Sequence, residues 1–526
     1  MSTMFFVLNC SLQILIVIIY IFVATLNWIG KEAVVNHDKE VPFKLIEKVP
    51  SVSVGKGSKN LIIHGDNLEA LKALMPFYQG KVKCIYIDPP YNTGNEGWVY
   101  NDRVNSPKIR EWLTKVVGRE GEDLTRHDKW LCMMYPRLKL LRDLLKKDGV
   151  IFVSIDDNEQ HHLRMLMDEI MGESNFITTI VWSRKRGRDN SAKYFSKSHE
   201  YVFMYARNIS FAKVLKLEMD SETEKAYRNP ENDKRGPYRL LGAWARGTQN
   251  GPRFEFISKN GKKFSERMWL FSEVNMKKLD AESKLTFVGD KVYRKLFRNE
   301  HTGSVPETIW DDASNAANAS DEIKKLFGSQ VFDTPKPTPF IARILKISTK
   351  DDDLILDSFA GSGTTAEAVI TLNKSDGGNR KFILIEMENK VAKSITANRI
   401  KKVIKRESVE VGFEYCDLAK PLFSEKGQIN EACSYDELAT YVYFTETQMN
   451  IDKRLVTQPF VGKCGEYSYY LIYAGKNKND LTRAALTKLK IVGPAVIYAD
   501  RCLVDEAELK EKGIIFKQIP YEIKVY

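Results

Sequence analysis

The sequence predicts an α/β fold of the Rossmann type, in which strands alternate with helices around a mostly parallel sheet. Two apolar stretches far apart in the chain support this prediction, because residues 84–87 and residues 354–356 both read as short buried strands. Each stretch ends abruptly at a turn that begins with an aspartate, Asp88 or Asp357. In open α/β sheets ligands bind at the carboxyl ends of the strands, so both turns are candidate site elements.

The first turn reads Asp88, Pro89, Pro90 and Tyr91. Proline has no N–H to donate and a nearly fixed φ angle, so the chain must leave the sheet as a stiff turn. Asp88 and the carbonyl of Pro89 can then accept both protons of an exocyclic amine, while Tyr91 offers a face to a planar ring. An ordinary turn with a surface carboxylate is the alternative interpretation. The apolar strand followed by this four-residue motif favours the amine site.

The second turn is rich in glycine and leads into a predicted helix over residues 365–372. Gly361 and Gly363 permit positive φ angles and a close approach of the backbone to a ligand. The spacing is not that of a phosphate-binding loop and no lysine follows, which argues against a nucleoside triphosphate. The next predicted strand, residues 381–385, ends at Glu386, and an acid at this position suits the two hydroxyls of a ribose.

These two motifs resemble those of amino-group DNA methyltransferases, which use S-adenosylmethionine. The Asp-Pro-Pro-Tyr motif resembles that of the adenine-N6 enzymes, whereas cytosine-N4 enzymes usually carry serine where Asp88 stands. The catalytic motif precedes the glycine motif, as in the β class. The chain further resembles the modification subunit of type III restriction–modification systems over roughly residues 27–205 and 305–526. The stretches that carry this resemblance are Asn27–Lys31, His64–Asn67, Asp88–Gly94, Ile155–Glu159, Phe332–Pro337 and Asp357–Thr365.

The resemblance implies a Rossmann-like methyltransferase core and a set of site residues. The implied catalytic residues are Asp88, Pro89, Pro90 and Tyr91. The implied cofactor-binding residues are Asp66, Lys336, Pro337, Asp357, Phe359, Gly361, Ser362, Gly363, Thr364 and Glu386. Asp66 would contact the adenine of the cofactor, although a helix N-cap is an equally good interpretation of this residue. Lys336 and Pro337 would close over its methionine end, with a stiff linker as the alternative.

The domain organisation expected from these motifs has five segments. They are an apolar extension over residues 1–26, a catalytic half over 27–206, a target-recognition insertion over 207–305, a cofactor-binding half over 306–409 and an α/β block over 410–526. The insertion is predicted because this segment is polar, contains scattered aromatic residues and loses the periodicity of the core. The last block shows no chemistry of its own, so we expect it to contact a partner.

The charge balance fits a polyanionic partner. The 80 lysines and arginines exceed the 69 acidic residues, which gives a formal charge of +11. A basic run beside the catalytic half, Arg184, Lys185, Arg186 and Arg188, is predicted to contact DNA phosphates, although such runs are often only solvated. The seven cysteines are scattered without metal-binding spacing, so we expect free thiols in a reducing cytoplasm and no metal.

The segment from residue 4 to residue 26 is nearly all apolar and carries no charge. Its length would allow a membrane span, and it lacks the basic start of a secretory signal. Because the resemblance begins only near residue 27, we interpret the segment as an upstream extension and the protein as cytoplasmic.

The functional hypothesis is therefore an adenine-N6 DNA methyltransferase that acts on a base flipped out of double-stranded DNA. The expected partners are double-stranded DNA, a second copy of the chain, and a restriction subunit with helicase or nuclease activity. Cytosine N4, RNA or a protein amide are the alternative substrates, and asparagine in place of Asp88 would favour the amide. A non-catalytic DNA-binding protein with a methylase fold is the other alternative, but both motifs are intact.

Overall fold

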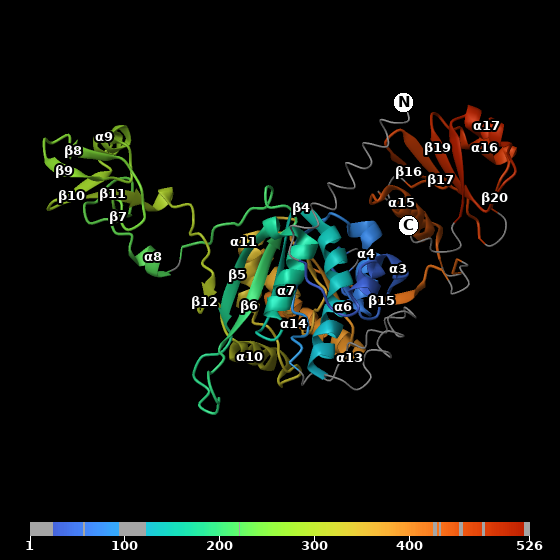
Figure 1. The fold of residues 1–526 in the computed structure, drawn as a ribbon, viewed down its shortest axis with the longest axis horizontal. Coiled ribbons are helices and arrows are strands. Elements are labelled where there is room, and N and C mark those ends of the chain that lie inside the picture. The colour runs from blue at the N-terminus through green and yellow to red at the C-terminus, as the bar shows by residue number, and fades with distance from the viewer. Residues whose placement is uncertain are drawn as a thin grey trace. The chain divides into compact units, whose positions relative to one another are not determined.

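The computed structural model describes residues 25–55, 58–93, 122–219, 221–423, 429–430, 433–451, 456–475 and 479–519. These residues form two compact units, drawn in Figure 1. One unit consists of the chain up to Val214 and from Thr308 onward, and the other of Leu215–Glu307. The second unit covers nearly the same residues as the segment 207–305, in which target recognition was expected. That role stays a prediction.

A ten-stranded sheet forms the centre of the first unit. In order across the sheet its strands are β1 (Lys44–Lys48), β15 (Glu414–Pro421), β2 (Leu61–His64), β14 (Lys381–Glu386), β13 (Leu354–Asp357), β3 (Val82–Ile87), β4 (Leu145–Ile155), β6 (His199–Ala206), β5 (Phe176–Ser183) and β12 (Ile309–Trp310). The strands from β15 to β4 are all parallel, and β6 runs antiparallel to both of its neighbours. The mostly parallel sheet confirms the predicted fold class.

The two strands predicted to carry the site lie side by side in this sheet. Strand β13 pairs with β3 in parallel, with Ile355 opposite Cys84 and Leu356 opposite Ile85. All four residues are completely buried. Parallel strands buried on both faces read as continuous apolar runs, which is why the sequence pattern identified them.

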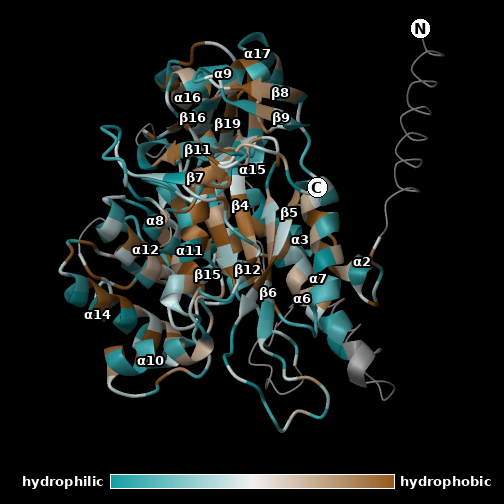
Figure 2. Ribbon diagram, turned by 90° about the vertical axis from the view of Figure 1, so that its left-hand side faces the viewer, coloured by the Kyte–Doolittle hydropathy of each residue, from teal (hydrophilic) through white to brown (hydrophobic). Residues whose placement is uncertain are grey.

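Helices cover both faces of the sheet, and Figure 2 shows the apolar strands between the two helical layers. One layer contains α4 (Asn67–Tyr78), α6 (Glu122–Leu144) and α7 (Gln160–Met167), and the other contains α11 (Thr338–Ser348), α12 (Thr364–Asp376) and α14 (Ala397–Glu407). From β13 the chain continues through α12 to β14, whereas from β3 it continues through α6 to β4 on the opposite side. The sheet therefore has a topological switch point between β13 and β3, which is where open α/β sheets bind ligands.

Shorter elements complete the core. They are α2 (Lys31–Val34), α3 (His37–Glu40), α10 (Ala316–Phe327), α13 (Asn389–Val391), two π-helical turns at Asp168–Gly172 and Ala392–Thr396, and two 3₁₀ turns at Glu173–Asn175 and Arg298–Glu300, the last of which lies in the second unit. Among the described residues no helix is long and apolar enough to cross a membrane. The apolar segment of residues 4–26 lies outside the described residues apart from its last two positions.

The end of the chain forms a smaller α/β block with a core of its own. Its elements are α15 (Tyr435–Thr447), β16 (Phe460–Cys464), β17 (Tyr467–Leu471), β18 (Asp480–Leu481), α16 (Arg483–Leu489), β19 (Ala495–Ala499), β20 (Arg501–Cys502), α17 (Glu506–Glu511) and β21 (Ile514–Gln518). Strand β15 falls within the expected block of residues 410–526 but belongs to the central sheet, because it pairs with β2 over residues 414–417.

The second unit has a separate aromatic core. It contains β7 (Tyr238–Gly242), β8 (Arg253–Ile257), β9 (Lys263–Met268), β10 (Leu285–Val288) and β11 (Lys291–Phe297), with helices α8 (Ser221–Lys225) and α9 (Glu273–Ala281). Phe256, Phe264 and Trp269 are buried together with Met276 and Val292. Several of the aromatic residues noted in the sequence therefore stabilise this unit from inside.

Candidate active site

Two cavities adjoin at the switch point of the sheet. The smaller, of about 270 Å³, lies over the ends of β13 and β14, and the larger, of about 660 Å³, lies over the ends of β3, β5 and β6. The residues that line both cavities are Asp88, Thr334, Pro335, Lys336 and Glu388. Asp88 thus stands at the junction, where a group bound in one cavity can meet a group bound in the other.

The stiff turn after β3 is anchored from below. The carbonyl of Pro90 accepts a hydrogen bond of 2.7 Å from Nε1 of Trp130, whose ring is completely buried in α6. Pro89 lines the larger cavity beside Asp88 and Tyr91. The Pro90 carbonyl therefore already has a partner inside the protein. The Asp88 carboxylate and the Pro89 carbonyl remain as the candidate acceptors for an amine.

Both carboxylate oxygens of Asp88 have partners. The hydroxyl of Tyr91 lies 2.8 Å from Oδ1, and Nζ of Lys336 donates to Oδ2 at 2.5 Å. Burial would lower the pKa of Lys336, but the charges of Asp88 and Glu200 outweigh it and raise that pKa. Burial, together with the same two carboxylates, raises the pKa of Tyr91 well above its usual value. An ammonium and a neutral phenol therefore face Asp88.

Glu200, at the start of β6, was not identified from the sequence. Its side chain is buried, its Oε2 lies 3.0 Å from the Tyr91 hydroxyl and 3.6 Å from Nζ of Lys336, and its Oε1 pairs with Arg184 at 2.9 Å. A carboxylate at the edge of an apolar strand was the only signal in the sequence. Arg184 lines the larger cavity, whereas the exposed Lys185, Arg186 and Arg188 do not. The DNA-phosphate role of these four basic residues stays a prediction.

The glycine turn adopts the backbone that the sequence suggested. Gly361 and Gly363 have φ angles of 49° and 82°. A Cβ at Gly361 would lie 3.1 Å from the ring of Phe332, which lines the smaller cavity. Glu386, at the end of β14, accepts the backbone N–H of Gly361 at 2.8 Å. The turn and the acid therefore form one wall of the smaller cavity. A side chain at Gly361 would reduce the room that this cavity offers a ligand.

Asp357, the last residue of β13, holds the start of the glycine turn by hydrogen bonds. Its carboxylate accepts the N–H of Phe359 at 3.0 Å and the hydroxyl of Thr365 at 2.5 Å. Burial raises the pKa of Asp357 to about 7 despite these two hydrogen bonds. The folded protein thus holds this proton more tightly than the unfolded chain does. The resulting stabilisation is complete at low pH and is lost as the pH rises through about 7.

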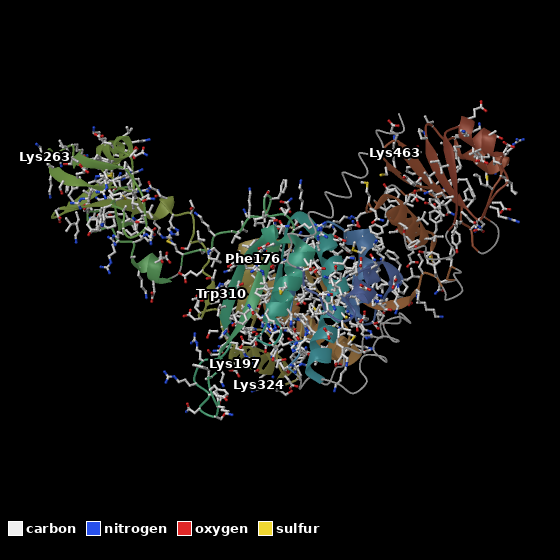
Figure 3. All side chains as sticks on the ribbon, in the orientation of Figure 1. Phe176, Lys197, Lys263, Trp310, Lys324 and Lys463 are labelled. Carbon is white, nitrogen blue, oxygen red and sulfur yellow. The ribbon has the colours of Figure 1, made fainter. Side chains whose placement is uncertain are left out.

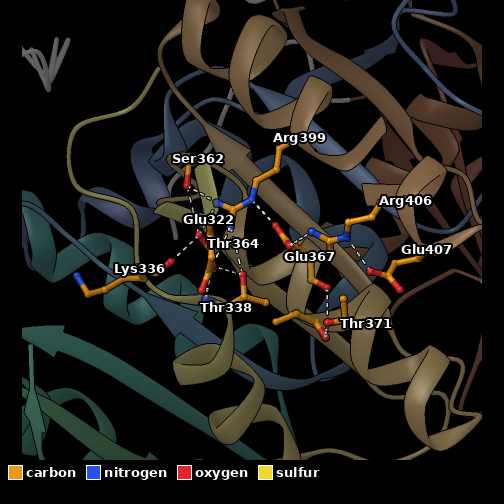
Figure 4. A network of polar contacts seen from close by, with 11 residues as sticks. Glu322, Lys336, Thr338, Ser362, Thr364, Glu367, Thr371, Arg399, Arg406 and Glu407 are labelled. Atoms are coloured by element: carbon orange, nitrogen blue, oxygen red, sulfur yellow. Dashed lines mark hydrogen bonds and ion pairs between the residues drawn. The ribbon is translucent and has the colours of Figure 1, made fainter. Parts of the chain in front are cut away.

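A buried arginine fixes the glycine turn to the rest of the site (Figure 4). Arg399 of α14 donates to the hydroxyls of Ser362 and Thr364 at 2.7 and 2.8 Å and pairs with Glu367 at 2.6 Å. The hydroxyl of Thr364 in turn donates to the backbone carbonyl of Lys336 at 3.1 Å. Sequence reasoning missed Arg399, because a basic helix usually presents its charges to solvent.

The structure separates the predicted cofactor residues into two sets. Those that line the smaller cavity are Lys336, Asp357, Phe359, Gly361, Ser362, Thr364 and Glu386. Pro337 and Gly363 are instead the N-cap residues of α11 and α12. Asp66 caps α4 by accepting the N–H groups of Leu68 and Glu69 at 2.9 and 3.1 Å, as its alternative interpretation requires. Its contact with a cofactor stays a prediction.

A second polar cluster holds the residue after Tyr91. Glu159 is fully buried and contacts Nδ1 of His127 at 2.5 Å and Nδ1 of His162 at 2.8 Å. It also accepts a hydrogen bond from Asn92, which has a φ angle of 56°. Among the described residues this is the one group of three possible metal ligands. Both imidazoles contact Glu159 directly, so the cluster forms a hydrogen-bonded anchor for the turn that contains Asp88 and Tyr91.

Comparison with known proteins identifies the family. A family model described as DNA methylase, of the N6 and N4 type, matches residues 82–398, which include the Asp88 turn and the glycine turn. The chain is 33% identical over 476 residues to the Mod subunit of the type III restriction-modification enzyme StyLTI of Salmonella typhimurium, covering 85% of this chain and 70% of that protein. It is 34% identical over 450 residues to the EcoPI Mod subunit of Escherichia phage P1, covering 73% and 68%.

Among solved structures, the PvuII DNA methyltransferase, which is cytosine-N4-specific, matches 66% of this chain and 93% of its own at 14% identity, with a TM-score of 0.34. The family match confirms the predicted DNA methyltransferase and its cofactor, S-adenosylmethionine. Together, the family model and the two Mod subunits show that this chain belongs to the DNA methylase family.

Proposed function

We propose that this DNA methylase transfers a methyl group from S-adenosylmethionine to the N6 amine of adenine in double-stranded DNA. The observation that carries the proposal is the position of Asp88, which lines both adjoining cavities. The smaller cavity suits the cofactor and the larger suits a flipped base. Aspartate at this position favours adenine over cytosine, in line with the resemblance to the adenine-N6 enzymes.

The walls of the smaller cavity fit the cofactor. Gly361 keeps the space open, and Glu386 ends the strand after the glycine turn, where an acid suits ribose hydroxyls. Phe359 and Pro335 add apolar surface to the same cavity. When bound, S-adenosylmethionine supplies an electrophilic methyl group on its sulfonium. Arg399 holds the turn that would face it, so that little reorganisation is needed on binding.

The larger cavity fits a purine held by its amine. Tyr91 and Trp182 bring aromatic rings to this cavity, and Asp88 and Pro89 bring acceptors. Each oxygen of Asp88 already accepts one hydrogen bond, and a carboxylate oxygen can accept two, so the amine can bind alongside Tyr91 and Lys336 or in exchange for one of them. Glu200 lies within 3.6 Å of the Lys336 ammonium and can keep its charge paired during this exchange. Held by two acceptors, the amine directs its lone pair towards the junction, where proximity supplies much of the rate.

The direct test identifies the methylated base. Purified protein would be incubated with S-adenosylmethionine and duplex DNA, the DNA digested to nucleosides, and the methylated nucleosides separated. We expect N6-methyladenine, and sequencing of modified bases in DNA from expressing cells would give the site. N4-methylcytosine as the product, or methylation of RNA or protein with unmodified DNA, would contradict the proposal.

We further propose that the unit Leu215–Glu307 reads the DNA sequence. It is a compact unit with its own core, inserted between the catalytic turn and the glycine turn. Exchanging residues 215–307 for those of a relative should change which adenine is methylated while catalysis is retained, because base contacts discriminate by about 1–3 kcal/mol each. Sequencing of the modified bases measures the outcome. An active exchanged protein that still methylates the original site would place sequence reading elsewhere.

The likeness to Mod subunits of type III restriction-modification enzymes supports proposals about partners. We propose a homodimer, a restriction subunit as partner, and the cytoplasm as location, where the DNA is. The C-terminal block of residues 410–526 is the proposed contact region for that partner. Light scattering of the purified protein tests the dimer, and co-expression with the restriction subunit of a related type III enzyme tests the partner.

A further inference from the structure

The loop between β5 and β6 begins and ends at the larger cavity. Trp182 and Arg184 mark the end of β5, Glu200 lies at the start of β6, and all three line that cavity. From there residues 184–198 extend away from the sheet, as Figure 1 shows below β5 and β6. Figure 3 labels Lys197 on this loop. Both ends of the loop therefore border the cavity that the flipped base would enter.

Two hydrogen bonds close the base of the loop and define its tip. The N–H of Lys185 donates to the carbonyl of Ser198 at 3.2 Å, and the N–H of Asp189 donates to the hydroxyl of Ser196 at 2.7 Å. The six residues between Asp189 and Ser196 form the tip. The loop has this defined base although its side chains are mostly exposed.

The tip presents two neighbouring aromatic rings to solvent. Tyr194 is 80% exposed and Phe195 is 89% exposed, the highest values for aromatic side chains among the described residues. Leaving two adjacent rings in water is unfavourable, so such a pair is typical of a binding surface. Because stacking on aromatic side chains is a general way to bind nucleobases, these rings fit a nucleic acid.

The charges around the rings indicate the same partner. Residues 184–198 contain six basic side chains and one acidic one. The basic ones are Arg184, Lys185, Arg186, Arg188, Lys193 and Lys197. Nζ of Lys193 lies 5.2 Å from the centre of the Tyr194 ring. Exposed aromatic rings among lysines and arginines match a duplex, which presents phosphates outside and stacked bases inside.

We propose that the tip of this loop enters the duplex at the target site, where Tyr194 or Phe195 occupies the place of the flipped adenine. This inference rests on the proposed function, because it requires a paired base that has to leave its stack. Flipping leaves a gap between neighbouring bases, and an inserted ring restores part of the lost stacking. The aromatic tip would thus stabilise the flipped state, while Asp88 and Tyr91 hold the base in the cavity.

The test compares two duplexes that carry the methylation site found by sequencing. One has the target adenine paired with thymine, and the other has an abasic position opposite it. The double variant Tyr194→Ala/Phe195→Ala should lose ten- to hundredfold in kcat/KM on the paired duplex. Most of this loss should return on the abasic duplex, because an unpaired base leaves its stack more easily. With 2-aminopurine at the target position, the fluorescence rise on binding should be smaller for the variant than for the unmodified protein.

Two control variants separate insertion from other effects. Phe211→Ala removes a ring that is 46% exposed elsewhere in the same unit and should leave both rates unchanged. Arg186→Ala removes a charge from the loop and should weaken activity on both duplexes alike. Unchanged S-adenosylmethionine affinity would show that the double variant is folded.

Three outcomes are informative. Normal activity of the double variant on the paired duplex would overturn the proposal and leave the rings for another partner, such as a protein. An equal loss on both duplexes would also overturn it, because the rings would then contribute only to DNA affinity. If the sequencing finds no N6-methyladenine, the proposed function itself fails before either duplex is made, and this result is distinct from the other two.

Discussion

Replacing Asp88 with alanine should reduce methyl transfer at least a thousandfold while the affinity for S-adenosylmethionine stays within a few fold of normal. The variant loses a charged acceptor for the amine, and a hydrogen bond to a charged group contributes about 1.5–3 kcal/mol. Misorientation of the amine at the junction of the cavities adds to this loss, and each 1.36 kcal/mol corresponds to a factor of ten in rate. Single-turnover transfer of a labelled methyl group to duplex DNA measures the rate, and calorimetry measures the affinity.

The variant should fold, since Glu200 remains near the Lys336 ammonium after Asp88 is removed. Asp148→Ala is a matched control, because this carboxylate pairs with Lys83 at the opposite end of β3, at 2.7 Å. It should transfer methyl groups at the normal rate. Near-normal transfer by Asp88→Ala would show that the amine is held by other groups and would remove the basis of the proposed mechanism.

Gly361→Leu should lower the affinity for S-adenosylmethionine at least a hundredfold. A side chain at Gly361 starts 3.1 Å from the ring of Phe332, on a backbone with φ of 49°, and both residues line the smaller cavity. The leucine side chain would fill the space proposed for the cofactor and would disturb the hydrogen bond from the Gly361 N–H to Glu386. Isothermal titration with S-adenosylmethionine is the measurement.

Backbone strain alone must be separated from this steric effect. Gly377→Leu provides the control. Gly377 is the C-cap residue of α12, the helix that follows the glycine turn, and it has a φ angle of 73°. A Cβ at Gly377 would point into open space. A left-handed conformation costs a non-glycine residue roughly 1–2 kcal/mol, so both variants should lose some stability. Only Gly361→Leu should lose cofactor affinity. If a folded Gly361→Leu protein binds normally, the glycine turn is not the cofactor site.

The sequence was most informative where backbone chemistry is local. Two prolines after an apolar strand allow few conformations, and two glycines before a helix mark a turn that other residues avoid. The turn at Asp88 and the positive φ angles at Gly361 and Gly363 follow from these rules alone. That both strands belong to a parallel sheet follows almost as directly, because each is apolar on both faces.

The sequence alone determined the two turns, the carboxylates that follow their strands, and the family. Which side chains surround Asp88 depends on how the distant parts of the chain fold together. Glu200 reaches Tyr91 and Lys336 because β6 lies next to β4. Lys336 reaches Asp88 from the segment before α11, more than two hundred residues away in the chain. Sheet order and helix packing set these long-range contacts, and they arise from the burial of the whole core. A single stretch of sequence carries no record of which neighbours that burial brings together.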